Sequence, residues 1–162
     1  MSLITDDPYF IDFPGRVKKI QEEMARRKID VYLGSRLRTL SFILDTFCPW
    51  RSFVVIPAEG MPSAFTFVID AARVLDETWL DEDHVFGFAP MGGQDQIEQI
   101  SDVIRGALEN GRGRLGVESG MSNYLPEGWL THYEYERFSA ALPGVELVNA
   151  HGIVDEISMI KD

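Results

Sequence analysis

Two strongly β-prone runs separated by a short turn constrain the fold of this chain more than any other feature. Residues 52–56 and 65–69 are rich in β-branched and aromatic side chains, and the segment 57–62 between them supplies proline and glycine. Runs of this kind joined by turn residues pair as a β-hairpin. The sheet of this protein is therefore expected to contain an antiparallel pair.

Shorter apolar runs predict four further strands, at residues 31–33, 85–88, 115–117 and 145–148. Together with the hairpin they give six strands, and helical patterns separate most of them. This alternation predicts an α/β fold with a mixed six-stranded sheet flanked by helices.

The helical patterns place apolar residues three or four positions apart. Five helices are expected, with inner faces formed by Val17, Ile20 and Met24; by Val74 and Leu75 after a cap at Asp70; by Ile97, Ile100, Ile104 and Leu108; by Leu130, Tyr133, Phe138 and Ala141 after Pro126; and by Ile153, Ile157 and Ile160. The third of them is expected to end in a left-handed cap at Asn110-Gly111. Residues 90–93 are expected to break the chain, and residues 37–47 to mix helix and loop.

Composition indicates one domain and excludes several classes of protein. The chain has 162 residues, 45% of them hydrophobic, and a net charge of -11 that would repel nucleic acid. The first residues do not resemble a signal peptide, and no apolar run reaches the roughly 20 residues of a membrane-spanning helix. We therefore expect a cytoplasmic protein without nucleic-acid or membrane partners. A single cysteine, Cys48, excludes an internal disulfide and predicts a buried thiol.

Several patterns that can carry chemistry have simpler structural explanations. Residues 111–116 match G-x-G-x-x-G, but a predicted helix precedes them and a strand follows, so no helix N-terminus would face a phosphate. His132 and Glu136 lie four apart on a predicted helix, which is one ligand short of a catalytic zinc site. We expect His84 and His151 to be surface or helix-capping residues.

Glu118, at the end of a predicted strand, is the best candidate among the carboxylates for a residue that lines a functional cleft. The alternative is that it holds a neighbouring loop through backbone hydrogen bonds, and we favour this structural role. The chain has no G-x-S-x-G elbow, convincing nucleophile, metal cluster or phosphate loop. The sequence therefore predicts no catalytic residue and no metal ligand in this chain.

The order of these segments resembles the amino-terminal domain of the creatinase, prolidase and aminopeptidase P family. Most of the resemblance lies in Gly116-Val117-Glu118, Met121-Ser122, Leu142-Pro143-Gly144-Val145-Glu146-Leu147-Val148-Asn149-Ala150 and Ile153-Val154-Asp155-Glu156-Ile157-Ser158-Met159-Ile160-Lys161. Residues 16–31 are similar to the opening helix and strand of that family. The resemblance divides the chain into an N-terminal extension, 1–15, and a creatinase/prolidase N-terminal-like domain, 16–162.

The resemblance implies a mixed six-stranded sheet related in shape to ribonuclease H. It also implies a homodimer and a further partner, the C-terminal catalytic domain of the same protein, a pita-bread domain that binds two divalent metals (manganese, cobalt or zinc) or, in creatinase, none. All metal ligands of the family belong to that second domain, so no cofactor is implied for this fragment. Two departures leave the substrate open: residues 37–42 lack the family's asparagine and aromatic-Leu-Thr-Gly segment, and Ser158 replaces a frequent arginine.

In creatinase-like members an arginine just before the second strand reaches the active site of a neighbouring subunit, and Trp50-Arg51 occupies the comparable place here. A guanidinium could bind a substrate carboxylate while an indole walls the pocket. The alternative is that Trp50 packs and Arg51 is solvated. We favour this alternative.

The leading hypothesis is an auxiliary domain of a hydrolase that acts on Xaa-Pro peptides or on a creatine-like carbon–nitrogen bond. Such a domain would contribute dimer contacts and one wall of a neighbouring active site. The alternative hypothesis is a peptide- or protein-binding module without catalysis. A weaker third hypothesis is a small-molecule sensor with a polar pocket near Glu118.

Overall fold

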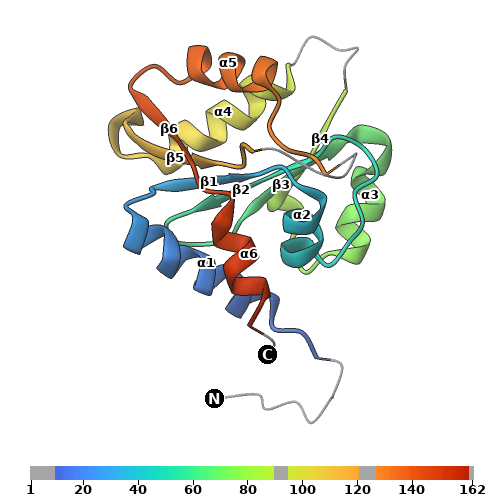
Figure 1. Ribbon diagram of the computed structural model, residues 1–162. Coiled ribbons are helices and arrows are strands. Elements are labelled where there is room, and N and C mark those ends of the chain that lie inside the picture. The colour runs from blue at the N-terminus through green and yellow to red at the C-terminus, as the bar shows by residue number, and fades with distance from the viewer. Residues whose placement is uncertain (1–9, 90–94, 121–126, 161–162) are drawn as a thin grey trace.

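The computed structural model describes residues 10–89, 95–120 and 127–160, which form one sheet covered by helices (Figure 1). The strands are β1 Val31–Gly34, β2 Phe53–Pro57, β3 Ser63–Phe67, β4 Val85–Phe88, β5 Gly113–Val117 and β6 Val145–Asn149. The α-helices are α1 Phe13–Arg27, α2 Leu37–Leu44, α3 Val68–Glu77, α4 Gln96–Ala107, α5 His132–Ala141 and α6 Gly152–Ser158. Short 3-10 helices, η1 Glu82–His84 and η2 Glu109–Gly111, precede β4 and β5.

The strands form one mixed sheet in the order β4-β3-β2-β1-β5-β6, which confirms the predicted class. β2 pairs antiparallel with β3, as the hairpin pattern predicted, and also with β1. The pairs β3–β4, β1–β5 and β5–β6 are parallel. These directions bring the carboxyl ends of β1, β5 and β6 to the same end of the sheet as the start of β2.

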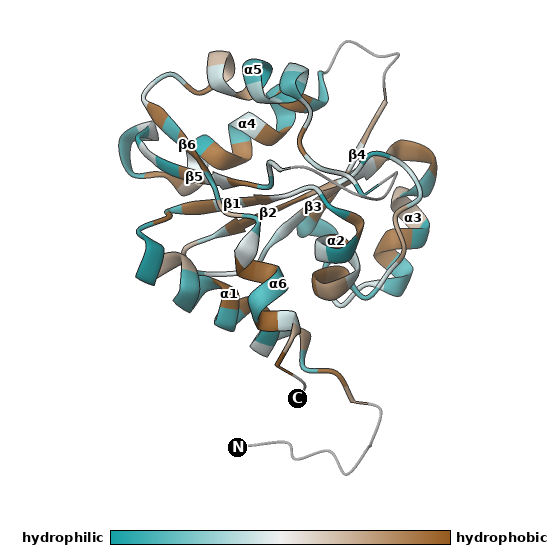
Figure 2. Cartoon of the chain, viewed as in Figure 1, coloured by the Kyte–Doolittle hydropathy of each residue, from teal (hydrophilic) through white to brown (hydrophobic). Residues whose placement is uncertain are grey.

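Helices cover both faces of the sheet (Figure 1): α4 and α5 lie on one face, and α1, α2 and α6 on the other. Side chains of β2 alternate between the two cores, with Phe53 and Val55 on the α4–α5 side and Val54 and Ile56 on the opposite side. Because both faces are buried, the central strands are apolar along their length, as Figure 2 shows.

Helix α1 is capped at both ends. The Asp12 carboxylate accepts a hydrogen bond from the Gly15 amide at 2.9 Å, and Lys28 ends the helix in a left-handed conformation. The helix starts at Phe13, whose side chain is buried, and so begins ahead of Arg16. The division of the chain at residue 15 stays a prediction.

The boundary between β3 and α3 differs from the predicted one. β3 ends at Phe67, and Val68 and Ile69 form the first turn of α3 although both are β-branched. Asp70 therefore lies inside the helix rather than capping it, and it pairs with Arg73 through two hydrogen bonds of 2.8 and 2.6 Å. This pair, and the position of the Asp70 carboxylate in the first turn of the helix, stabilise the helix where strand propensity would oppose it.

Residues 37–44 form a regular helix, α2, and residues 45–47 belong to no helix or strand, which agrees with the predicted mixture of helix and loop. Its buried face includes Thr39, Leu40, Ile43 and Leu44, and a left-handed Asp45 ends it. The polar Thr39 in the buried face obscured the helical period in the sequence. Its hydroxyl donates a hydrogen bond to the buried carboxylate of Glu118.

The predicted inner face of α4 is confirmed, since Ile97, Ile100 and Ile104 are buried. The predicted inner face of α5 is wrong in part: Phe138 is buried, but Tyr133 is exposed and Leu130 lies before the helix. Asn110 and Gly111 both have positive φ, as predicted, but they belong to η2, because α4 itself ends at Ala107 with Leu108 extended.

Ile153 of α6 is buried, whereas Ile160 lies beyond the helix and is exposed. Within the described residues, no helix is long and apolar enough to cross a membrane. The predicted roles of Pro126 and of residues 90–93 lie outside the described residues, as do Met121, Ser122 and Lys161 of the family resemblance.

Candidate functional site

Glu118 lies directly after β5, at the end of the sheet where β1 ends and β2 begins, and its side chain is fully buried. Its two carboxylate oxygens accept four hydrogen bonds. The amides of Ser35 and Arg36 donate to one oxygen at 2.7 and 2.8 Å, and the hydroxyls of Tyr32, at 2.7 Å, and Thr39 donate to the other. The predicted structural role is confirmed, because Glu118 holds the loop after β1 through backbone amides.

The electrostatics of Glu118 are those of a buried acid. Burial raises the pKa of its carboxyl, while the four donated hydrogen bonds act in the opposite direction. Burial and the adjacent carboxylate also raise the pKa of the Tyr32 phenol. The environment thus provides hydrogen bonds in place of a direct ion pair, which suits a structural anchor.

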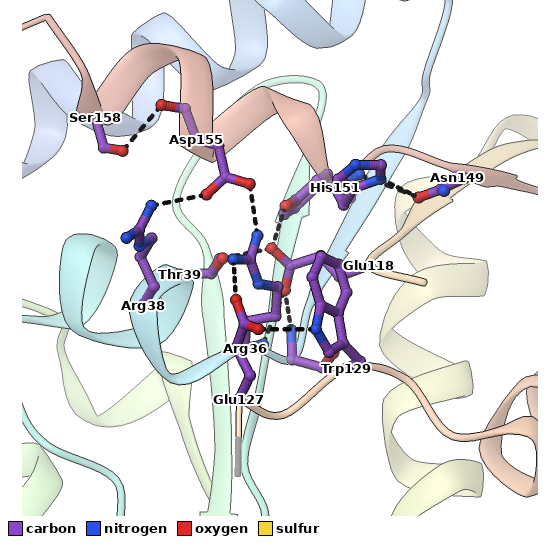
Figure 3. Close-up of polar contacts among 12 residues, drawn as sticks. Arg36, Arg38, Thr39, Glu118, Glu127, Trp129, Asn149, His151, Asp155 and Ser158 are labelled. Carbon is purple, nitrogen blue, oxygen red and sulfur yellow. Dashed lines mark hydrogen bonds and ion pairs between the residues drawn. The ribbon is translucent and has the colours of Figure 1, made fainter. Parts of the chain in front are cut away.

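A second buried charge, Arg36, lies beside Glu118 (Figure 3). Its side chain is only 4% exposed, and it forms ion pairs with Glu127 at 2.5 Å and with Asp155 at 2.8 Å. The guanidinium also stacks 4.1 Å from the centroid of the Trp129 ring, whose indole N–H donates to Glu127. Arg36 therefore joins the loop after β1, the segment before α5, and α6.

The loop after β1 and the segment 127–130 lie in direct backbone contact. The Leu37 amide donates to the Glu127 carbonyl at 3.1 Å. Gly128 has a φ of +90°, and a β-carbon at this position would lie 2.7 Å from the Ser35 carbonyl oxygen. Glycine is required here by both the backbone conformation and the close approach.

Arg51, which precedes β2, also links the loop after β1 to the segment 127–130. Its five N–H groups are all donated within the domain: two to the Glu134 carboxylate at 2.7 and 2.6 Å, and three to the carbonyls of Ser35, Gly128 and Trp129. Its guanidinium also packs 4.6 Å from the Phe53 ring centroid. Arg51 is thus held by acceptors within the domain, although 30% of its side chain stays exposed.

Trp50, the residue before Arg51, is half exposed, at 51%. Its ring lies 5.5 Å from that of Phe67, which in turn lies 5.9 Å from Phe88. The indole therefore packs on one side and faces outward on the other. Of the two residues predicted to lie near a substrate, Trp50 is the one with a free face.

The other candidate residues do not gather into a site. His132 and Glu136 are both exposed on α5, with 3.3 Å between Nε2 and Oε1. His84 contacts Asp81 after α3, and Cys48 is buried. No group of three or more metal-ligating side chains exists in the part of the chain that the structure describes. Residues 113–117 of the glycine pattern form β5, as predicted.

Sequence reasoning did not identify Arg36 or the pairing of Arg51 with Glu134. The partners of Arg36 are 91 and 119 positions away in the sequence, and Glu134 is 83 positions from Arg51. The capping box of Thr131 and Glu134 at the start of α5 was a detectable local pattern, but it gives no indication of the arginine. Only the topology of the sheet brings these charges together.

Comparisons with known proteins agree with this architecture. The family profile described as the Creatinase/Prolidase N-terminal domain matches residues 16–160. No curated protein matches the chain.

Solved structures share the fold at low sequence identity. A proline dipeptidase from Streptococcus pneumoniae has a TM-score of 0.69 at 16% identity, over 90% of this chain and 98% of that one. The N-terminal domain of the cytoplasmic peptidase PepQ from Mycobacterium tuberculosis has a TM-score of 0.66 at 18% identity, over 88% and 98%. A prolidase from Thermococcus sibiricus has a TM-score of 0.74 at 13% identity, over 94% of this chain but 38% of that one. The chain belongs to the creatinase/prolidase N-terminal domain family.

Proposed function

We propose that this chain is the non-catalytic N-terminal domain of a hydrolase resembling Xaa-Pro dipeptidases, aminopeptidase P or creatinase. The observation that carries the proposal is the family match over residues 16–160, joined to structural likeness with domains of proline-specific peptidases. The partner would be a C-terminal catalytic domain of the same protein. Like the peptidase PepQ, the parent protein would act in the cytoplasm.

In this proposal the chemistry belongs to the catalytic domain. Two divalent metals there, manganese, cobalt or zinc, would activate a water and polarise the scissile carbonyl. The domain described here would contribute to a homodimer and form one wall of the active site of the neighbouring subunit. The exposure of Trp50 supports this role, because its indole has an exposed face next to Arg51, which Glu134 holds in place.

The proposed roles of Trp50 and Arg51 differ. Every N–H group of Arg51 already has an acceptor, so direct contact with a substrate carboxylate would require Arg51 to leave Glu134, Ser35 or Gly128. We therefore assign substrate contact to Trp50, and to Arg51 the positioning of the segment that precedes β2.

Replacing Trp50 with alanine tests this wall. In the full-length parent, with manganese and a panel of Xaa-Pro dipeptides and creatine, Trp50→Ala is expected to lower kcat/KM by roughly 10-fold or more, because an apolar pocket contact is worth about 1–3 kcal/mol. The matched control is Tyr133→Ala, which removes another exposed aromatic ring, on α5. If both variants were as active as the wild type, Trp50 would not be part of the active site.

A peptide- or protein-binding module is the second candidate function. The exposed apolar side chains of Phe47, Trp50, Val68 and Ile69, on and near α3, favour it. Absence of turnover by the full-length parent on every substrate of the panel, with folded protein and bound metal, would select this candidate.

A further inference from the structure

The exposed large apolar side chains of the described residues, tyrosines apart, gather in two places. One group, on and near α3, is used by the functions proposed above. The other group flanks the start of α1 and the end of α6 and consists of Phe10, Ile11, Met159 and Ile160. We call this second group the α1–α6 face. Figure 1 shows the start of α1 and the end of α6 at the same end of the molecule.

A cavity of about 350 Å³ opens within the α1–α6 face. Its apolar walls come from Phe10 and Ile11 before α1, Phe42 of α2, and Ile157 and Ile160 at the end of α6. A dry cavity of about 150 Å³ already holds a molecule of benzene. The cavity is therefore large enough to admit a whole apolar side chain.

Arg16 of α1 fixes the walls of this cavity. Its guanidinium lies 5.2 Å from the centroid of the Phe13 ring and 4.3 Å from that of Phe42, and it donates to the Phe42 carbonyl at 3.2 Å. Phe13 is itself buried. Because α1 and α2 are joined in this way, the face is formed within this domain, and a partner that docks there orders little further chain.

The position of the α1–α6 face indicates what covers it. α6 ends at Ser158, and Ile160, the last residue described, lines the cavity. The chain spans 38% of the Thermococcus sibiricus prolidase. In a parent protein of that kind, the catalytic domain would continue from the edge of this face.

The size of the face favours a domain of the same protein over a separate one. Each partner in a stable complex of two separate proteins buries about 800 Å². Four side chains that are 42–80% exposed supply only part of that area. A domain that continues from Ile160 has an effective concentration of about millimolar and needs less area to stay docked.

We propose that the α1–α6 face is the docking surface for the catalytic domain of the same protein, and that an apolar side chain of that domain enters the cavity between Phe10, Phe42 and Ile157. The inference rests on the proposed function for the existence of that domain. It names the surface that holds the two domains in a fixed orientation, apart from the residues around Trp50.

Hydrogen exchange of the full-length parent and of the 162-residue chain, measured by mass spectrometry, tests this docking. The amides of residues 10–16 are expected to exchange at least about 10-fold more slowly in the parent. This segment is informative because it lies far along the chain from residue 162. The reference is η2, residues 109–111, which does not line the face and is expected to exchange equally in both proteins.

Charged variants of the parent test the apolar contact. Ile11→Asp is expected to return residues 12–16 to the exchange rate of the 162-residue chain, because a carboxylate cannot be buried against an apolar surface without a partner. An acid just before a helix is favourable, so the variant is expected to fold. Ile160→Asp, at an exposed position beyond α6, is a second variant with the same expected result. The matched control, Tyr133→Asp on α5, is expected to keep the slow exchange.

Three results overturn the proposal. The first is equal exchange of residues 10–16 in the two proteins, or slower exchange confined to residues 157–160, which continuation of the chain alone would cause. The second is slow exchange that Ile11→Asp and Ile160→Asp both retain. The third is slow exchange in the 162-residue chain that is lost on dilution, which would identify a second copy as the occupant.

Failure of this proposal is distinguishable from failure of the proposed function. The exchange measurement requires no substrate and no metal. An inactive parent with slow exchange at residues 10–16 would contradict the hydrolase and support the docking surface. An active parent without slow exchange there would do the reverse.

Discussion

Replacing Glu118 with leucine is expected to lower the free energy of unfolding by about 3–5 kcal/mol. The substitution leaves four donors without their acceptor in a fully buried site. The hydroxyls of Tyr32 and Thr39 can turn towards other acceptors. The amides of Ser35 and Arg36 cannot. Urea unfolding followed by circular dichroism measures the loss.

Glu118→Gln is the matched variant and is expected to cost no more than about 1 kcal/mol. The glutamine oxygen can accept from the amides of Ser35 and Arg36, while its NH₂ group donates to the hydroxyls of Tyr32 and Thr39. Loss of the charge also removes the cost of burying it. Similar costs for the leucine and glutamine variants would contradict the assignment of Glu118 as an acceptor for backbone amides.

The difference in stability between the wild type and Glu118→Gln is expected to depend on pH. Because burial raises the folded-state pKa of Glu118 above its ordinary value of 4.5, the folded state binds more protons than the unfolded state above that pH. The wild type is therefore expected to lose stability relative to Glu118→Gln as the pH rises from 4.5 to the folded-state pKa. The other carboxylates titrate in both proteins, so the difference between them isolates Glu118.

Replacing Arg36 with methionine is the second change with a large expected effect, a loss of about 2–4 kcal/mol. The substitution removes a buried cation that pairs with Glu127 and Asp155 and stacks on Trp129. Both carboxylates are partly hydrated, which places the loss below that of a fully buried pair. Urea unfolding measures the stability, and indole fluorescence reports the release of Trp129.

Arg38→Met is the control for Arg36. Arg38 contacts the same carboxylate, Asp155, at 3.1 Å, but its side chain is 60% exposed. An exposed ion pair of this kind contributes no more than about 1 kcal/mol. Equal losses for the two variants would show that burial and stacking of Arg36 do not stabilise the domain.

Much of the fold follows from local patterns in the sequence. The faces of α1 and α4, the β2–β3 hairpin and the left-handed ending at Asn110-Gly111 depend on residues close together in the chain. The end of β3 was misplaced because Val68 and Ile69 favour strands intrinsically, whereas the Asp70–Arg73 pair stabilises a helix there.

Less of the candidate site was predictable. Glu118 could be placed at a strand end, and its role as a loop anchor could be foreseen, because a buried strand precedes it. The partners of Arg36 and Arg51 could not be foreseen, since each contact joins residues more than 80 positions apart. The alternation of strands does not specify which helix N-terminus or loop supplies the carboxylate.

The central claim is that this domain carries no chemistry of its own. The most direct test is hydrolysis of Xaa-Pro dipeptides and creatine by the purified 162-residue chain, with added manganese, cobalt or zinc, beside the full-length parent. The account predicts turnover by the parent alone. Metal-dependent turnover by the 162-residue chain, retained through purification, would contradict it.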